Sequence, residues 1–259
     1  ITVIKGFGKF NADGDILVHD EENQVTNIVK GKNTIIATGG RARPIPGIDF
    51  DGDKIMSYHH AILLEQLPKD VIIIGGGAIG VEFGYVMKAY DTDVTIVEML
   101  PNLLPTLDKE VAQVVEAAFK KDKIKVKTGT AVKAIDKTKT GVVVTVENDG
   151  REEKLEAEKA LVSIGFAANS ENIGLETLGV ETDHGWIKVD EDFKTNVDGI
   201  YAIGDVIGNP LLAHAASAEA ELCVEKLAGE KTYGYDPLKV PGCIYCQPQV
   251  ASVGLTEEQ

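Results

Sequence analysis

The chain has 259 residues, of which 44% are hydrophobic and 26% are charged, a composition typical of soluble globular proteins. Its formal net charge of −15 disfavours nucleic acid and anionic membrane surfaces as partners, because both are negatively charged. No apolar run approaches the ~20 residues of a membrane-spanning helix, and the N-terminus has no signal-peptide pattern. We therefore expect a soluble, cytoplasmic protein of about two domains, with no nucleic-acid or membrane partner.

Short strands joined by turns are predicted for residues 1–38, since Asp13-Gly14 separates two apolar runs. The Gly- and Pro-rich segment 39–52 is predicted to be a linker. Ser57 is a suitable N-cap for a helix that extends through Leu64.

A strand, a glycine motif and a helix follow one another between Val71 and Gly84. Val71–Ile74 predicts a buried strand, and the next segment has G-x-G-x-x-G spacing. Gly75 allows a tight turn, Gly77 lets a pyrophosphate approach the backbone, and Gly80 lets helix and strand pack closely. The free N–H groups of the helix N-terminus favour phosphate. The following helix has apolar residues at helical spacing: Ile79, Phe83, Val86 and Tyr90.

Glu98 follows the next predicted strand, Val94–Val97, where a dinucleotide-binding unit places the acid that binds the adenosine ribose. Its carboxylate can accept hydrogen bonds from both ribose hydroxyls and would repel a 2′-phosphate. The next residues, Met99 to Pro101, include no Arg to bind that phosphate. The sequence therefore predicts NAD binding in preference to NADP, against the alternative of a simple strand-to-helix turn.

The pattern continues with a helix after Asp108, a third strand at Ile124–Val126, and a meander over Val132–Leu155. The helix has apolar positions at Val111, Val114, Val115, Ala118 and Phe119. Leu161–Ile164 predicts a further buried strand that returns at Gly165.

A second candidate site lies at residues 195–206, where the predicted strand Ile200–Ile203 ends in Gly204-Asp205 and a helix begins near Leu211–Ala213. Asp205 could bond a sugar or ribityl hydroxyl, and the helix N-terminus suits an electron-rich group. A turn with an Asx cap is the alternative.

No cysteine or histidine is predicted to be catalytic or to bind a metal. Cys243 and Cys246 form a C-x-x-C without a second such pair, and an offset of three places their side chains on opposite faces of a strand. Redox or metal roles for this pair are the less favoured alternative. Cys223 is expected in the core of a helix. The four histidines other than His214 are expected to be solvated: His19, His59, His60 and His184.

Taken together, the motifs resemble the FAD-dependent pyridine nucleotide–disulfide oxidoreductases, most closely the NAD-linked dihydrolipoamide dehydrogenase branch. The matching segments occur in family order: GFGKF at 6–10, NTIIATGG at 33–40, VIIIGGGAIGVEFG at 71–84, VTIVE at 94–98, VSIGFAANSENIGLE at 162–176, TNVDGIYAIGDV at 195–206, PLLAHAASAEA at 210–220 and YCQPQVASVGLTE at 245–257.

The resemblance implies a role for two sets of residues. It implies NAD contacts along the glycine motif and pocket, with Glu82 beside the nicotinamide: Gly75, Gly76, Gly77, Ala78, Ile79, Gly80, Val81, Glu82, Glu98, Val132 and Gly165. It implies FAD contacts near the adenosine, the ribityl chain and the ring: Gly8, Thr38, Gly39, Gly40, Asp205, Leu211, Leu212, Ala213 and His214.

Four positions depart from the family pattern. Phe166 stands where the family usually has Arg, so a cation–phosphate contact from that position is lost. Ala168 replaces a common Pro, Ala220 a Gly, and Cys246 a Thr or Ser.

The resemblance implies an α/β fold, with a Rossmann-like NAD-binding domain inserted in a partial FAD-binding domain and followed by the start of an α+β interface domain. We expect FAD-domain segments at 1–53 and 169–235, the NAD domain at 54–168, and interface-domain residues at 236–259. The family's FAD glycine unit, redox cysteine pair and His–Glu pair are not found in these 259 residues. We therefore expect an internal part of a longer chain that alone holds FAD weakly and lacks turnover.

The implied reaction passes electrons from dihydrolipoamide through a disulfide and FAD to NAD. The implied partners are a second copy of the protein and dihydrolipoamide on the acyltransferase of a 2-oxoacid dehydrogenase complex. The location would be the cytoplasm, or the mitochondrial matrix in a eukaryote. Another flavoprotein disulfide reductase, an NADH oxidase and a non-catalytic NAD-binding module remain alternatives.

Overall fold

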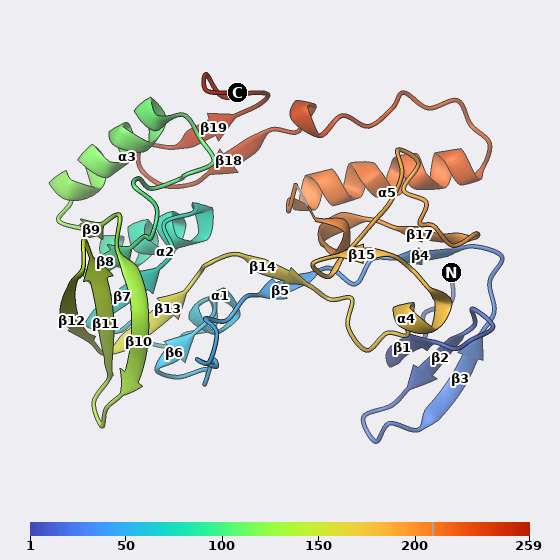
Figure 1. Cartoon of the computed structure of the whole chain (residues 1–259), viewed down its shortest axis with the longest axis horizontal. Coiled ribbons are helices and arrows are strands. Elements are labelled where there is room, and N and C mark those ends of the chain that lie inside the picture. The colour runs from blue at the N-terminus through green and yellow to red at the C-terminus, as the bar shows by residue number, and fades with distance from the viewer. Residues whose placement is uncertain (209) are drawn as a thin grey trace. The chain divides into compact units, whose positions relative to one another are not determined.

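The computed structural model describes residues 1–208 and 210–259, which form two compact units (Figure 1). Unit 1 comprises residues 1–41 and 167–240, and unit 2 comprises residues 42–166 and 241–259. The chain passes between the units within β5 (Gly40–Ala42) and β14 (Phe166–Ala168), which pair with each other, and a third time between residues 240 and 241. The four-part domain division drawn from the sequence stays a prediction.

A five-stranded parallel sheet forms the centre of unit 2, in the order β6-β13-β7-β8-β9. Its strands are β6 (Ile55–Met56), β7 (Asp70–Ile74), β8 (Asp93–Val97), β9 (Lys125–Lys127) and β13 (Lys159–Val162). The chain builds outward from β7 through β8 and β9, then returns to place β13 on the other side of β7. The winding therefore reverses between β7 and β13, the position where open α/β sheets bind ligands. This sheet confirms the α/β prediction.

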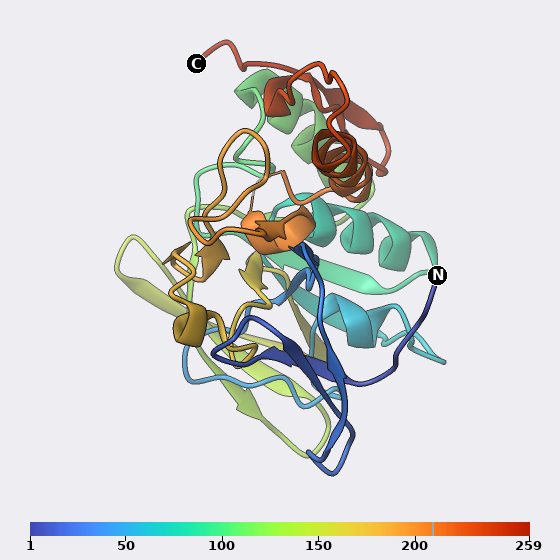
Figure 2. The same ribbon diagram turned by 90° about the vertical axis from the view of Figure 1, so that its right-hand side faces the viewer.

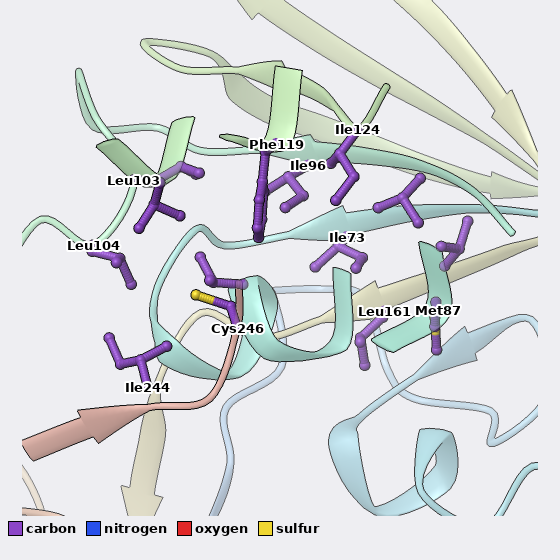
Figure 3. Close-up of a cluster of buried hydrophobic side chains, with 14 of the residues drawn as sticks. Ile73, Met87, Ile96, Leu103, Leu104, Phe119, Ile124, Leu161, Ile244 and Cys246 are labelled. Atoms are coloured by element: carbon purple, nitrogen blue, oxygen red, sulfur yellow. The ribbon is translucent and has the colours of Figure 1, made fainter. Parts of the chain in front are cut away.

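Alternate residues of the central strands enter two different cores. Ile73 and Ile96 pack among helices on one face, as Figure 3 shows, whereas Ile72 and Ile74 pack against Val144 on the other face. The first face is covered by α2 (Ala78–Ala89), α3 (Lys109–Lys121) and the hairpin of β18 (Gly242–Ile244) and β19 (Val250–Ser252), with α1 (Tyr58–Ala61) contributing Ala61. The second face is covered by the antiparallel strands β10 (Ala131–Lys137), β11 (Val142–Asn148) and β12 (Arg151–Ala157).

The two long helices of unit 2 bury only some of the residues that apolar spacing indicates. Helix α2 buries Gly80, Val81, Gly84 and Met87, while Val86 and Tyr90 are exposed. Glycines let this helix approach the sheet, because a Cβ on Gly84 would lie 2.9 Å from Ile96 Cδ1. On α3, Val115 and Phe119 are buried as expected, but Val114 is exposed.

Ser57 is the N-cap of α1 as predicted, but this helix ends at Ala61 rather than Leu64. The next two residues, Ile62 and Leu63, are exposed. A helix this short is stable only where its side chains pack against other elements. Because Ile62 and Leu63 are exposed, they do not stabilise a further turn of α1.

Unit 1 contains an antiparallel meander, drawn in blue in Figure 2, and several two-stranded ladders. Its strands are β1 (Phe7–Phe10), β2 (Ile16–His19), β3 (Val25–Val29), β4 (Thr34–Ile36), β15 (Thr182–Asp183), β16 (Trp186–Ile187) and β17 (Ile200–Ala202). Its helices are α4 (Leu175–Leu178), η1 (Gly204–Ile207), α5 (Ala213–Leu227) and η2 (Pro237–Lys239). Ile36 and Ala202, from the parallel pair β4 and β17, lie in the main core of this unit. Across the described residues, no helix is long and apolar enough to cross a bilayer.

We predict that Gly80→Ala destabilises unit 2 by about 2 kcal/mol or more, through overpacking. A Cβ at this position would lie 1.9 Å from Gly75 O, and backbone cannot rotate away as a side chain can. Urea unfolding followed by circular dichroism measures the loss. Gly77→Ala is the matched control, since nothing lies within 4 Å of the Cβ it would add. Equal stabilities for the two variants would contradict the predicted close packing.

Candidate functional site

A cavity of about 590 Å³ lies in unit 2 where the sheet changes its direction of winding. Gly75 follows β7 and Gly165 follows β13, and both line this cavity. Three further residues predicted from the sequence line it as well: Gly77, Glu98 and Val132. The structure thus brings together, from four separate segments, five of the residues expected to bind NAD.

The three motif glycines are required for different reasons. Gly75 has φ +106°, and a Cβ there would lie 2.3 Å from Ser163 O. Gly80 contacts the same turn, through Gly75 O. These two therefore serve the tight turn and close packing, as predicted. Gly77 is the N-cap of α2 and has open space where its side chain would be. That space is what a phosphate approaching the backbone needs.

Glu98 holds the glycine loop as well as facing the cavity. It is only 8% exposed. Its Oε2 accepts the Gly76 N–H at 2.6 Å, and its Oε1 accepts the Leu100 N–H at 2.7 Å. A carboxylate has about four acceptor sites, so each oxygen can accept one more hydrogen bond. The sequence predicted the ribose contacts alone and missed this attachment of the loop.

Ser163 is a cavity residue that sequence reasoning missed. Its hydroxyl lies 3.1 Å from Ile74 O and 3.3 Å from Gly75 O, and its N–H donates to Ile74 O at 2.7 Å. It therefore joins the ends of β7 and β13. The sequence placed Ser163 inside the predicted strand Leu161–Ile164, whereas β13 ends at Val162 and leaves Ser163 at the same edge of the sheet as Gly75.

The cavity lining, which falls within the described part of the chain, does not include the other motif residues: Gly76, Ala78, Ile79, Gly80, Val81 and Glu82. Gly76 donates to Glu98, while Ala78, Ile79 and Val81 lie in the first turns of α2. The Glu82 carboxylate accepts the Tyr245 N–H at 2.8 Å. This bond ties α2 to the segment that leads from β18 to β19.

Several of the residues expected to contact FAD lie together in unit 1, at the ends of two parallel strands. β4 leads into Thr38–Gly40, and β17 leads into Gly204 and Asp205. A Cβ on Gly40 would lie 3.4 Å from the Asp205 Cβ. Asn169 fixes the loop, since its amide donates to Thr38 O at 3.0 Å and its N–H to Gly39 O at 2.9 Å.

Helix α5 begins beside this loop. Leu212 is its N-cap, Ala213 and His214 begin its first turn, and Leu211 directly precedes the cap. A Cβ on Gly204 would lie 3.2 Å from the Ala216 Cβ.

The Glu219 carboxylate, 2% exposed, accepts the Gly204 N–H at 2.7 Å. Nothing in its sequence context distinguished Glu219 from a surface residue of the helix.

Gly8 lies in β1, opposite Val18. Its neighbour Phe7 lines a smaller cavity of about 400 Å³ together with Thr38 and Asn169. The meander and the loop after β4 therefore share one cavity of unit 1.

Contrary to the prediction, Cys243 and Cys246 do not share a strand, because β18 ends at Ile244 and Cys246 lies beyond it. Cys243 is exposed, and Cys246 is buried with its Sγ 3.1 Å from Pro248 O. Cys223 is buried in α5, and this burial raises the pKa of its thiol. The described residues contain no group of three or more His, Cys, Asp or Glu side chains placed to hold a metal ion.

We predict that Glu98→Ala lowers the free energy of unfolding by about 2 kcal/mol in the absence of any ligand, because two N–H groups lose their acceptor. Thermal and urea unfolding measure this loss. Met99→Ala is the control, since Met99 lines the same cavity but is 68% exposed. If the Glu98 variant is as stable as the Met99 variant, the carboxylate does not hold the loop.

Comparisons with known proteins agree on the family. Residues 2–220 match the sequence model of the pyridine nucleotide-disulphide oxidoreductases. A dihydrolipoyl dehydrogenase of Mycobacterium tuberculosis is 46% identical over 261 residues, which cover 100% of this chain and 56% of the relative.

Two solved structures are similar across the fold. The structure of LpdA from Mycobacterium tuberculosis superposes with a TM-score of 0.90 at 26% identity, covering 99% of this chain and 56% of that one. The HOCl-induced flavoprotein disulfide reductase RclA of Escherichia coli gives 0.86 at 25% identity, covering 100% of this chain and 58% of that one. These similarities confirm the expected Rossmann-like fold. This chain spans about half the length of the relatives it matches, and it belongs to the pyridine nucleotide–disulfide oxidoreductase family.

Proposed function

We propose that unit 2 binds NAD(H) in the cavity between the ends of β7 and β13. The observation that carries this proposal is the convergence of the glycine loop, the start of α2 and the Glu98 carboxylate on that cavity. The residues fit the cofactor, because Gly77 leaves open space beside the loop and Glu98 retains free acceptor sites. When bound, the nicotinamide is the hydride acceptor of the chemistry.

In this arrangement the N-terminus of α2 faces the diphosphate with N–H groups and a partial positive charge. Glu98 binds the hydroxyls of the adenosine ribose and disfavours a 2′-phosphate, so NAD is preferred over NADP. Val132 and Gly165 border the cavity. The remaining motif residues would position α2, and Glu82 would lie beside the nicotinamide end of the bound NAD(H).

We further propose that unit 1 contributes to an FAD site. Thr38–Gly40 and Asp205 meet at the ends of β4 and β17, and α5 begins next to Gly204. Asp205 would bond the ribityl chain, and the Leu211–His214 segment would face the flavin ring. Gly8 would lie toward the adenosine.

For the whole protein we propose an NAD-linked dihydrolipoamide dehydrogenase. Its dithiol substrate would be dihydrolipoamide carried by the acyltransferase of a 2-oxoacid dehydrogenase complex, and it would act as a homodimer. The cytoplasm is the proposed location, or the mitochondrial matrix in a eukaryote. The 46% identity to a dihydrolipoyl dehydrogenase over the whole chain supports this substrate class.

A second candidate is a flavoprotein disulfide reductase with another substrate, since the RclA structure superposes over the whole chain. Assays of the full-length protein with dihydrolipoamide, oxidised glutathione and dioxygen distinguish the two, because the first proposal expects turnover with dihydrolipoamide and NAD to be fastest.

We predict that Gly77→Val weakens NADH binding at least about tenfold, a loss of ~1.4 kcal/mol, because a branched side chain would occupy the space left for the diphosphate. Isothermal titration calorimetry measures the affinity. Gly234→Val serves as the control, since Gly234 lies in unit 1 and also has open space around its Cβ position. Unchanged NADH affinity in the Gly77 variant would remove the proposal for this cavity.

A further inference from the structure

The cavity of unit 2 has one cationic side chain in its lining. Among its lining residues, all within the described part of the chain, Arg43 is the single Lys, Arg or His, and Glu98 is the single acid. A dinucleotide carries two phosphate charges into this cavity, and the chain as a whole has a formal net charge of −15. Backbone N–H groups supply only partial positive charge. The full positive charge of Arg43 would therefore face the two phosphate charges of a bound dinucleotide.

Arg43 is held at the edge of the cavity by its backbone. Its N–H donates to Gly165 O at 3.0 Å, and Gly165 lies in the short turn between β13 and β14. Its side chain is exposed and makes no hydrogen bond or ion pair with the described residues. The guanidinium is thus free to bind a ligand.

Arg41, two residues earlier, differs in each respect. Its guanidinium donates to Ala168 O at 2.6 Å and pairs with Glu171 at 2.7 Å. It lies in unit 1, outside the lining of this cavity. One arginine of the segment is therefore occupied by the fold, and the other is not.

Phe166, next to Gly165, supplies no charge to this edge of the cavity. Its ring packs against Tyr58, with centroids 5.7 Å apart. Because this position is committed to an aromatic contact, any cation for a phosphate must come from another segment. Arg43 lines the same cavity as Gly165 and comes from a different segment of the chain.

We propose that Arg43 is the phosphate-binding cation of this cavity and contacts the diphosphate of the bound dinucleotide. This inference rests on the proposed NAD(H) site. A guanidinium can donate two parallel hydrogen bonds to a phosphate, a geometry that ammonium lacks. Together with the N–H groups at the start of α2, it surrounds the diphosphate with donors.

The test compares Arg43→Ala with wild type for NADH, ADP-ribose and adenosine, using calorimetry for the first two and NMR titration for adenosine. We expect about tenfold weaker binding of NADH and ADP-ribose, the effect of one partly exposed charge-assisted contact, and unchanged adenosine binding. The salt dependence of NADH affinity should also decrease. Arg43→Lys keeps the charge and should recover part of the lost affinity. Arg41→Ala is the matched control and should leave all three affinities unchanged.

Unchanged NADH and ADP-ribose affinity in Arg43→Ala would overturn the inference while leaving the NAD(H) proposal intact. Equal losses for ADP-ribose and adenosine would also overturn it, because the variant would then have disturbed the cavity instead of removing a phosphate contact. A wild-type chain that binds no NADH would instead contradict the proposed function itself.

Discussion

The buried carboxylate of Glu98 joins the ends of two neighbouring parallel strands, and the geometry of the cavity depends on it. Glu98 directly follows strand β8, and the glycine loop that it holds through Gly76 follows β7. Ser163 attaches the same loop to the end of β13. Three adjacent strands are thus connected at the edge where the winding of the sheet reverses. A loop fixed in this way presents its N–H groups to a ligand without first having to become ordered.

Unit 1 contains the same kind of interaction, a buried glutamate that accepts the N–H of a glycine. Glu219 is a buried carboxylate that accepts the N–H of a glycine at the end of a parallel strand, directly beside the start of a helix. The glycine, Gly204, immediately precedes Asp205, which contacts the loop after the neighbouring strand. In both units a charge-assisted hydrogen bond fixes a glycine whose neighbours face the proposed cofactor. Each glutamate therefore positions this backbone, and for Glu98 this role is additional to the proposed ribose contacts.

The elements that the sequence predicted well are those with strong local signals. The apolar run before Gly75 could only be a buried strand, and the conformations of Gly75 and Gly80 follow from contacts that any side chain would prevent. The same local patterns were only partly correct for the buried faces of helices. Val86 and Tyr90 continue an apolar spacing along α2, but the glycines determine which face approaches the sheet. Helix propensity likewise could not show that α1 ends at Ala61, because its length depends on burial.

Residues that act through contacts distant in sequence could not be found by pattern alone. Glu98 was recognised for its place after a strand, yet its bond to Gly76 spans 22 residues. The segments around Ser163, Arg43 and Glu219 did not indicate what these side chains do, because each acquires its contacts only when the strands are paired. The position of Glu82, bonded to Tyr245, also depends on the return of the chain to unit 2 at residue 241.

Hydrogen–deuterium exchange with and without saturating NADH tests the central claim most directly, because it locates the ligand on the backbone. The account predicts slower exchange at residues 75–82 and 163–165 of unit 2 when NADH is bound, with no change in the β1–β3 meander of unit 1. Protection confined to unit 1, or no protection of the glycine loop at saturation, would contradict the assignment of this cavity as the dinucleotide site.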